Sequence, residues 1–478
     1  MSKISPVVLW SCAIMLVLFL TAVIFRPLLP IDETRYMTVA WEMRLNNAWL
    51  APLTLNFEPY SHKPPMLFWL INLFWSLFGI SRWAGLIPVA LISLSCVFLT
   101  IRLGRRIFSP ENFDATKIMW LLLGSVPFFI YSTLVMFDMA MMALTICSLL
   151  CLLTYAEKRQ FRYMFLLGLF TGLALLTKGP VAWLYVIFPM LLGPWWVQGF
   201  SKPLSWYADC TAGLLISIIP LSIWLLPVLS MSDNNFAFWL LWQQSAGRVA
   251  GNFSDAHVRP FYFYLPLLPL IFAPWIFLPA FWKSLKPTIV DAIKHLKNPL
   301  THLPKKNDAS IYPLRFIICW ILPVFLCFSM ISGKQPHYLI PLMPGVIFLI
   351  AILLKSVPIK TIRHTACVVI ILGIFAQSVA AQTFFRSYDL KPIASYVEKH
   401  QGKDWAWVRN YHGEIGFIGK IKKPITNLDD RQKLAAWFDE HPEGLAVVRY
   451  NDKSEVAHLK EIASSDYRGK HMGIFAKN

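Results

Sequence analysis

The sequence predicts a mainly α-helical membrane protein with many spans and a small C-terminal α/β domain. Of its 478 residues, 56% are hydrophobic and only 15% are charged, and the mean hydropathy is +0.53. A water-soluble domain of this length has no core large enough to bury so many apolar side chains, so lipid must surround most of the chain. Beyond residue 385 the composition becomes polar. We therefore expect a transmembrane domain, 1–385, and a C-terminal domain, 386–478.

Apolar segments long enough to cross a bilayer recur along the first domain. A transmembrane helix needs roughly 20 mostly apolar residues, and on this criterion we expect about eleven spans. The first span has a basic start but is followed by Arg26-Pro27 rather than by a small-residue cleavage site, so we expect an anchor and not a removed signal peptide. The expected spans are 7–25, 84–103, 116–132, 135–155, 162–177, 180–197, 207–229, 261–282, 314–331, 337–354 and 364–385.

The positions of Lys and Arg predict the orientation in a bacterial inner membrane. Basic residues collect in alternate short loops, which is typical of the cytoplasmic side. With the N-terminus cytoplasmic, the loops 26–83 and 230–260, the turn 332–337 and the C-terminal domain are expected in the periplasm. The net charge of +18 follows from this distribution, and no basic face indicates a nucleic-acid partner.

The C-terminal domain alternates helix-like and strand-like segments. Helices are expected near 393–400 and 431–440, and strands at 405–409 and 445–450. The domain has no Gly-rich phosphate loop, no nucleophile motif and no paired Cys or His, although His412 and Glu414 are close in sequence. We therefore expect it to shape a substrate site or bind a partner rather than to perform catalysis.

The first periplasmic loop is the expected place for the chemistry. Asp32 and Glu33 follow the first span directly and are themselves followed by Arg35 and Tyr36. Residues 36–47 mix apolar and polar side chains in a way that suits a short helix along the membrane interface. Such a helix would hold Asp32 near the lipid head groups. Taken alone, the acidic pair is explained equally well by a helix N-cap.

Further motifs occur in order along the rest of the chain. They are Arg26-Pro27-Leu28, Asp32 to Tyr36, Glu42-Met43, His62 to Pro65, Phe78-Gly79, Asp138, Leu176 to Pro180, His257 to Phe261 and Gly333 to Pro341. With these motifs the chain resembles the bacterial aminoarabinose transferases that act on lipid A, and more distantly the protein O-mannosyltransferases, both of the GT-C superfamily. One departure is His62, because most aminoarabinose transferases have Glu before Lys-Pro-Pro.

The resemblance implies a fold and a reaction. The fold is a multi-span GT-C domain of about 11–13 helices, with interfacial helices in the first periplasmic loop. The reaction is transfer of a hexosyl or pentosyl unit from a polyprenyl (undecaprenyl) phosphate carrier to lipid A or another envelope acceptor. A protein or glycan acceptor stays open, as does a flippase for lipid-linked sugars. Transporters often show two related halves, whereas this chain has no internal repeat, which favours the enzyme.

Three carboxylates are the candidate catalytic residues: Asp32, Glu33 and Asp138. Asp32 is the first choice for a group that assists displacement of the carrier phosphate at the anomeric carbon, or that orients an acceptor already anionic. Asp138 lies in an apolar segment, where a charge is costly unless it faces a polar cavity. We expect it to position the sugar or to support Asp32, and a helix cap is a compatible alternative.

Cations are expected near the outer membrane surface, because the carrier phosphate leaves as an anion. Positive side chains are otherwise depleted there, so those present need an explanation. Snorkelling to the interface is the alternative for Lys178 and the preferred interpretation for Lys334. The expected carrier- and sugar-binding residues are Arg35, Tyr36, Lys63, Lys178, Arg259 and Tyr338.

No cofactor is required by this scheme, but a divalent, zinc-like cation is one hypothesis. His62 and His257 lie on different periplasmic loops and are the candidate ligands. Two imidazoles fall short of the three or four protein ligands that zinc usually takes, and either ring would serve as a hydrogen-bond partner of a phosphate or a carbonyl.

Overall fold

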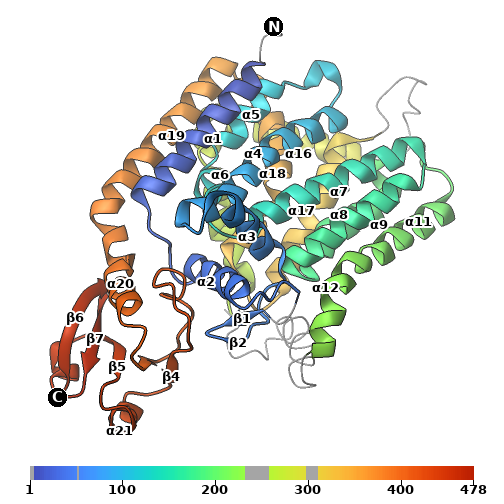
Figure 1. Ribbon diagram of the computed structural model, residues 1–478. Helices are drawn as coiled ribbons and strands as arrows, with labels where there is room; N and C mark the ends of the chain where they lie inside the picture. The colour runs from blue at the N-terminus through green and yellow to red at the C-terminus, as the bar shows by residue number, and fades with distance from the viewer. Residues whose placement is uncertain (1–4, 51–52, 232–257, 298–310) are drawn as a thin grey trace. The chain divides into compact units, whose positions relative to one another are not determined.

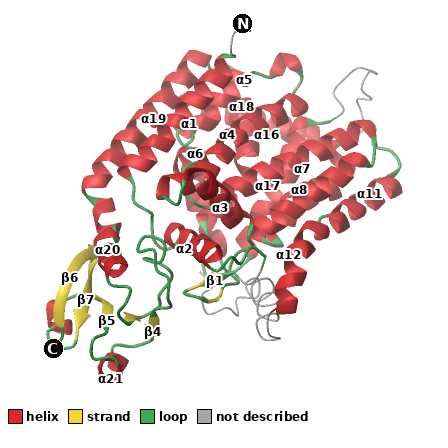
Figure 2. Ribbon diagram, in the orientation of Figure 1, coloured by secondary structure: helices red, strands yellow, loops and turns green. Residues whose placement is uncertain are grey.

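The computed structural model describes residues 5–50, 53–231, 258–297 and 311–478 (Figure 1). Helices make up most of the chain, and strands gather near its C-terminal end (Figure 2). The chain forms two compact units. Unit 1 comprises Met1–Leu18, Ser61–Leu67 and Val89–Gly373, and unit 2 comprises Phe19–Tyr60, Phe68–Pro88 and Ile374–Asn478. The expected division of the chain at residue 385 stays a prediction.

Seven helices or helix pairs of the described residues are long and apolar enough to cross a membrane, so the chain is a multi-pass membrane protein. They coincide with expected spans. These are α1 (Pro6–Phe25), α4 (Arg82–Ile107), α7 (Asp138–Lys158), α11 with α12 (Pro203–Ile216 and Ile218–Met231), α17 (Pro313–Met330), η5 with α18 (Pro336–Leu342 and Met343–Leu353) and α19 (Ile359–Gln382).

The remaining expected spans are helical but shorter or interrupted. Proline removes a backbone donor and glycine weakens a helix, so these residues divide the segments. Gly124 separates α5 from α6, and several prolines divide the segment from residue 261 onward. The pieces are α5 (Ala115–Leu123), α6 (Val126–Tyr131), α8 (Arg162–Lys178), α9 (Val181–Leu191), α10 (Gly193–Trp196), η3 (Phe261–Leu267), α15 (Leu268–Ile271), η4 (Trp275–Phe277) and α16 (Pro279–Lys297). The short helix η1 (Pro110–Asn112) lies between two expected spans.

Unit 1 is held together by close helix packing. Helices α7 and α8 lie side by side, and the hydroxyls of Ser148 and Thr171 are 3.1 Å apart between them (Figure 1). On its other side α8 meets α11 and α12 through Gly168 and Gly172, where a Cβ atom would come within 2.6 Å of the Gly213 carbonyl or 2.7 Å of the Ser217 carbonyl. Small residues let the backbones approach this closely in a membrane, where packing drives association.

The first periplasmic loop of the prediction contains two helices and a short hairpin. Helix α2 (Asp32–Leu45) begins earlier than expected, and α3 (Met66–Phe78) follows the hairpin of β1 (Thr54–Leu55) and β2 (Glu58–Pro59). The N-cap of α2 is Ile31, which makes no side-chain cap. Neither acid of the pair therefore acts as an N-cap.

Within unit 2, α2 is buried beneath the segment 413–421. The Thr38 hydroxyl donates to the Gly413 carbonyl at 2.8 Å and accepts from the Phe417 N–H at 2.9 Å. The indole of Trp41 donates to the Ile421 carbonyl at 2.8 Å. The C-terminal part of the chain thereby fixes the helix that carries Asp32.

The C-terminal segment forms one five-stranded sheet of order β4-β3-β5-β7-β6 (Figure 2). Strands β3, β4 and β5 are parallel, while β7 runs antiparallel to β5 and β6. The two expected helices and two expected strands are confirmed, whereas β4, β6 and β7 were not expected. The elements are η6 (Phe384–Tyr388), α20 (Lys391–Lys399), β3 (Trp405–Val408), β4 (Thr426–Leu428), α21 (Gln432–Glu440), β5 (Leu445–Tyr450), η7 (Lys453–Val456), β6 (Lys460–Tyr467) and β7 (Lys470–Ala476).

Both faces of this sheet are buried. Trp405 and Trp407 of β3 pack on one face with α20, whereas Ala406 and Val408 pack on the other with α21. The alternation follows from the two-residue repeat of a strand.

Candidate functional site

A buried ion pair joins two of the expected site residues in unit 1. Asp138 is the first residue of α7, and Lys178 is the last residue of α8. The Lys178 Nζ lies 2.5 Å from the Asp138 Oδ1, and their side chains are only 5% and 2% exposed. The N-cap of α7 is Phe137, so Asp138 does not act as a helix cap through its own side chain. Lys178 does not snorkel but neutralises a buried carboxylate.

Tyr338 completes this cluster. The Lys178 ammonium lies 4.8 Å from the centroid of the Tyr338 ring, close enough for a cation–π contact. The Tyr185 hydroxyl donates to the Tyr338 carbonyl at 2.7 Å and fixes the backbone of η5. The structure therefore brings together Asp138, Lys178 and Tyr338 from three segments far apart in the sequence.

The backbone of Arg259 is held against the backbone of the segment 332–334. Val258 pairs with Gly333 in an antiparallel bridge, and the Arg259 N–H donates to the Ser332 carbonyl at 3.1 Å. The buried Lys334 donates to the Arg259 carbonyl at 2.9 Å, which differs from the snorkelling expected for this lysine. Arg259 itself is exposed and forms no ion pair among the described residues. Lys334 is thus a positioning residue that the sequence did not reveal.

Asp32 and Arg35 pair on the first turn of α2 in unit 2. The Arg35 Nη2 lies 2.5 Å from the Asp32 Oδ1, and the side chains of Asp32 and Arg35 are 42% and 19% exposed. The Tyr36 ring packs against Phe68 and lies 5.6 Å from the Arg35 guanidinium carbon. Asp32 is therefore the accessible acid of the pair, with a cation held beside it.

Glu33 has different surroundings. It is 2% exposed, its carboxylate lies 3.2 Å from the Arg26 Nη1, and it accepts from the Leu29 N–H at 2.9 Å. Arg82 donates to the carbonyls of Ala22 and Val23 in the same region. These contacts fix the turn between α1 and α2, so the geometry favours a positioning role for Glu33. The sequence did not single out Arg26 or Arg82 for this role.

His62 and Lys63 lie between the β1–β2 hairpin and α3. Both residues are half-buried. His257 lies outside the described residues, so the zinc-like site stays a hypothesis. No group of three or more His, Cys, Asp or Glu in the described ranges has a metal-binding arrangement.

Comparison with known proteins confirms the resemblance that the motifs predicted. Residues 62–224 match the family of dolichyl-phosphate-mannose-protein mannosyltransferases. An undecaprenyl phosphate-α-4-amino-4-deoxy-L-arabinose arabinosyl transferase of Proteus mirabilis is 26% identical over 435 residues, covering 85% of this chain and 74% of the relative. A second such transferase, from Pseudomonas fluorescens, is 27% identical over 357 residues, covering 72% of this chain and 56% of the relative.

The solved structures show the fold. The crystal structure of ArnT from Cupriavidus metallidurans bound to undecaprenyl phosphate has a TM-score of 0.73 and 16% identity, covering 98% of this chain and 97% of that one. Its apo form gives a TM-score of 0.74. The GT-C fold expected from the motifs is thus confirmed. The chain spans about half to three quarters of the length of the curated relatives it matches.

Proposed function

We propose that this chain is a glycosyltransferase of the bacterial inner membrane that takes a sugar from undecaprenyl phosphate and transfers it to lipid A. The observation that carries the proposal is the buried Asp138–Lys178 pair beneath Tyr338, in a unit built from membrane-crossing helices. Burying ionisable groups among apolar helices is costly, so such a pair points to a functional role. The names of the relatives support a 4-amino-4-deoxy-L-arabinose donor, which makes the transferred group a pentosyl unit.

The carrier phosphate needs cations as it leaves. Arg259 is exposed, forms no ion pair in the described part of the chain, and has its backbone fixed by Lys334. Lys63 is half-buried in the segment before α3. Charge-assisted hydrogen bonds from such side chains stabilise a phosphate anion. Lys178 already neutralises Asp138, so its role is to keep that carboxylate in place near the sugar.

The reacting carboxylate is Asp32. The C1–O bond to the carrier phosphate breaks while the acceptor oxygen bonds to C1, which inverts the anomeric centre. An acceptor hydroxyl must lose its proton to a base, whereas an acceptor phosphate is already anionic and needs only orientation. Asp32 is accessible and held by Arg35, which suits either task. The distribution of Lys and Arg supports an orientation with the N-terminus in the cytoplasm and the C-terminal domain in the periplasm.

A protein acceptor is a second candidate. The family model that matches residues 62–224 describes protein mannosyltransferases, and it covers His62, Lys63, Asp138 and Lys178. The donor side of the reaction is the same in both cases. The acceptor distinguishes them.

The test is transfer by the purified protein in nanodiscs. The donor is undecaprenyl phosphate-linked 4-amino-4-deoxy-L-arabinose, and lipid A or a peptide rich in Ser and Thr is the acceptor. Mass spectrometry reads the mass gain of each acceptor. We expect a gain on lipid A that falls roughly 100-fold or more in Asp32→Asn. A gain on the peptide alone would move the proposal to a protein acceptor.

A matched variant controls for the loss of a carboxylate elsewhere. Asp114 caps α5 by accepting from the N–H groups of Thr116 and Lys117, and Asn caps a helix equally well. Asp114→Asn should therefore keep wild-type transfer. If both acceptors stay unmodified while the donor crosses to the opposite leaflet of reconstituted vesicles, the chain is a flippase and the proposal is wrong.

A further inference from the structure

A cavity of about 260 Å³ lies within unit 2, at one end of the C-terminal sheet. Its wall includes the last residues of β3, β5 and β6 and the first residues of β7. Ile31, the N-cap of α2, contributes an apolar patch. Asn410, Asn451 and His412 add hydrogen-bonding groups to a wall that is otherwise rich in arginine. None of these residues was a candidate for the transfer reaction.

The topology of the sheet explains why a cavity forms at this end. Strands β3 and β5 are parallel neighbours, with β4 beyond β3 and β7 beyond β5. After β3 the chain moves outward to β4, and after β5 it continues toward β6 and β7 on the opposite side. Adjacent parallel strands whose following loops diverge leave a crevice at their carboxyl ends. In open α/β sheets this switch point is where ligands bind.

Positive charge dominates the cavity. Five cationic side chains line it, against the two carboxylates Glu414 and Glu455. The cations are Arg409, Arg431, Arg449, Arg468 and Lys470. Such an excess in a confined space concentrates anions.

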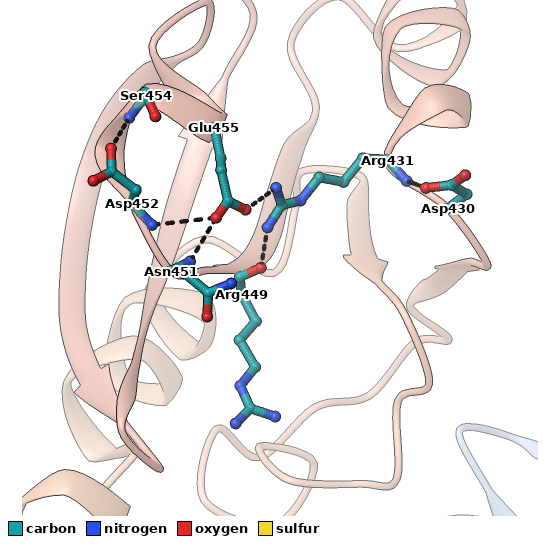
Figure 3. Close-up of polar contacts among 7 residues, drawn as sticks. All are labelled: Asp430, Arg431, Arg449, Asn451, Asp452, Ser454 and Glu455. Atoms are coloured by element: carbon teal, nitrogen blue, oxygen red, sulfur yellow. Dashed lines mark hydrogen bonds and ion pairs between the residues drawn. The ribbon is translucent and has the colours of Figure 1, made fainter.

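One of these arginines has a structural partner. Arg431 pairs with Glu455 and donates to the Arg449 carbonyl at 2.5 Å, and Glu455 also accepts from the N–H groups of Asn451 and Asp452 (Figure 3). This network anchors the turn after β5. Figure 3 shows the Arg449 guanidinium turned away from the Arg431–Glu455 pair.

The other four cations have no carboxylate within ion-pairing distance in the described ranges. The Arg449 guanidinium carbon lies 5.4 Å from the centroid of the Tyr467 ring, and its Nη2 donates to the Arg468 carbonyl at 3.4 Å. Arg409, Arg468 and Lys470 are exposed at the rim. Four like charges at one cavity repel one another unless an anion lies among them.

Glu414 cancels only part of this charge at neutral pH. It is 5% exposed and accepts from the His412 N–H at 2.7 Å. Burial raises the pKa of Glu414 to about 7, although that hydrogen bond, Arg35 and Arg468 oppose the shift. A fraction of the molecules therefore carries a neutral acid there, which can donate a hydrogen bond to a ligand oxygen.

The backbone at the rim is held in a sparsely populated conformation. Arg409 and Asn410 have φ of +68° and +29°, and Arg468 has φ of +52°. Non-glycine residues in this region are strained and cluster at ligand sites. Two loops from different strands thus hold arginine side chains at one opening.

We propose that this cavity is a binding site for a phosphorylated saccharide, with the phosphate held by Arg409, Arg449 and Arg468. Lys470 adds charge at the rim, and Asn410 and Asn451 provide hydrogen-bonding groups for sugar hydroxyls. Arginine suits this role because its planar fork gives two parallel bonds to phosphate oxygens. The ligand is a soluble sugar phosphate or the phosphorylated head group of a lipid. The site goes beyond the proposed transfer and does not depend on it.

Binding to the full-length protein in detergent tests the proposal. Isothermal titration uses α-D-glucose 1-phosphate, inorganic phosphate and glucose as probes. We expect saturable binding of glucose 1-phosphate, weaker binding of phosphate and none of glucose. The exposed pair Arg409→Gln/Arg468→Gln should weaken glucose 1-phosphate roughly tenfold or more. The exposed pair Lys422→Gln/Lys423→Gln removes the same charge from the same unit and should leave the affinity unchanged.

The outcomes separate the sources of the ligand. Lipid A in nanodiscs that displaces glucose 1-phosphate, when dephosphorylated lipid A does not, identifies a lipid head group. No displacement identifies a soluble sugar phosphate. If the wild type binds neither phosphate probe, or the arginine and lysine pairs behave alike, the cavity is not such a site. This assay measures binding and contains no sugar donor, so its failure and a failure of the transfer experiment can be told apart.

Discussion

The Lys178 ammonium and the Asp138 carboxylate form an ion pair of 2.5 Å between the end of one helix and the start of another. Burying either charged side chain alone would be costly, whereas the two together carry no net charge. The pair also holds Lys178 over Tyr338. A polar cluster is thereby fixed inside an apolar unit, and its stability and its function can be tested separately.

Replacing one partner of the Asp138–Lys178 pair should lower the stability of the protein. We expect Lys178→Met to lower the free energy of unfolding by about 3–5 kcal/mol, because it leaves Asp138 buried and uncompensated. The double variant Asp138→Asn/Lys178→Met should recover most of that stability but not the transfer activity. Thermal unfolding in detergent and the transfer assay give the two measurements. A double variant with wild-type turnover would remove the pair from the site.

A half-exposed pair in the same unit is the control. Arg106 and Glu157 are 2.8 Å apart, with side chains 33% and 30% exposed. Arg106→Met should cost less than about 1 kcal/mol, because water screens such pairs. An equal loss in both single variants would mean that burial of the Asp138–Lys178 pair is not what makes it important.

Substitutions of the neighbouring acids Asp32 and Glu33 should have different effects on stability and on transfer. Glu33 accepts from Arg26 and from the Leu29 N–H in a buried turn, whereas Asp32 is partly exposed. Glu33→Gln should therefore lower the melting temperature, with a cost of about 3 kcal/mol or more. Asp32→Asn should leave the melting temperature nearly unchanged and abolish transfer. The reverse pattern would make Glu33 the reacting carboxylate.

Glu414 should make stability depend on pH. Burial raises its pKa from 4.5 to about 7, so the folded state holds the proton more tightly than the unfolded state. The stabilisation that this proton contributes is complete below pH 4.5 and is lost as the pH rises through 7. The free energy of unfolding falls by about 3 kcal/mol in total over this range. Glu414→Gln should abolish this loss in thermal unfolding between pH 5 and pH 8. Glu443→Gln, at an exposed position, should keep the wild-type profile.

The contact between α2 and the segment 413–421 should be sensitive to one methyl group. A Cβ on Gly416 would collide with the Thr38 methyl and lie 2.8 Å from its hydroxyl oxygen. We expect Gly416→Ala to cost about 1–3 kcal/mol. Gly402→Ala has open space around its Cβ and should be nearly neutral. Hydrogen exchange of α2 amides should accelerate only in Gly416→Ala, and equal protection in both variants would contradict this packing.

Much of the helical architecture could be predicted because lipid imposes a simple rule. Each span must satisfy its own backbone hydrogen bonds and expose apolar side chains, so length and hydropathy locate it. The rule fails where glycine or proline interrupts the helix of an apolar segment. The segment 116–132 divides at Gly124 into α5 and α6, and the segment 261–282 becomes a series of short turns rich in proline.

The candidate residues could be predicted because they are charged side chains within or beside apolar segments. Asp138 and Lys178 stand out because charges are rare in spans, and Asp32 stands out beside the first anchor. Their partners were not predictable. Lys334 was expected at the interface, and neither Arg26 nor Arg82 was expected to hold the turn before α2, because the sequence does not say which carbonyl or carboxylate a cation meets.

The sequence by itself therefore determined a multi-pass helical membrane protein, the alternating segments of its C-terminal domain and the identity of its unusual charges. Those properties depend on local composition and periodicity. Only the tertiary structure decided that Lys178 neutralises Asp138, that Glu33 fixes a turn while Asp32 stays accessible, and that four arginines and a lysine meet at the end of one sheet. Those outcomes depend on strand order and helix packing, which join residues far apart in the chain through contacts that no local pattern encodes.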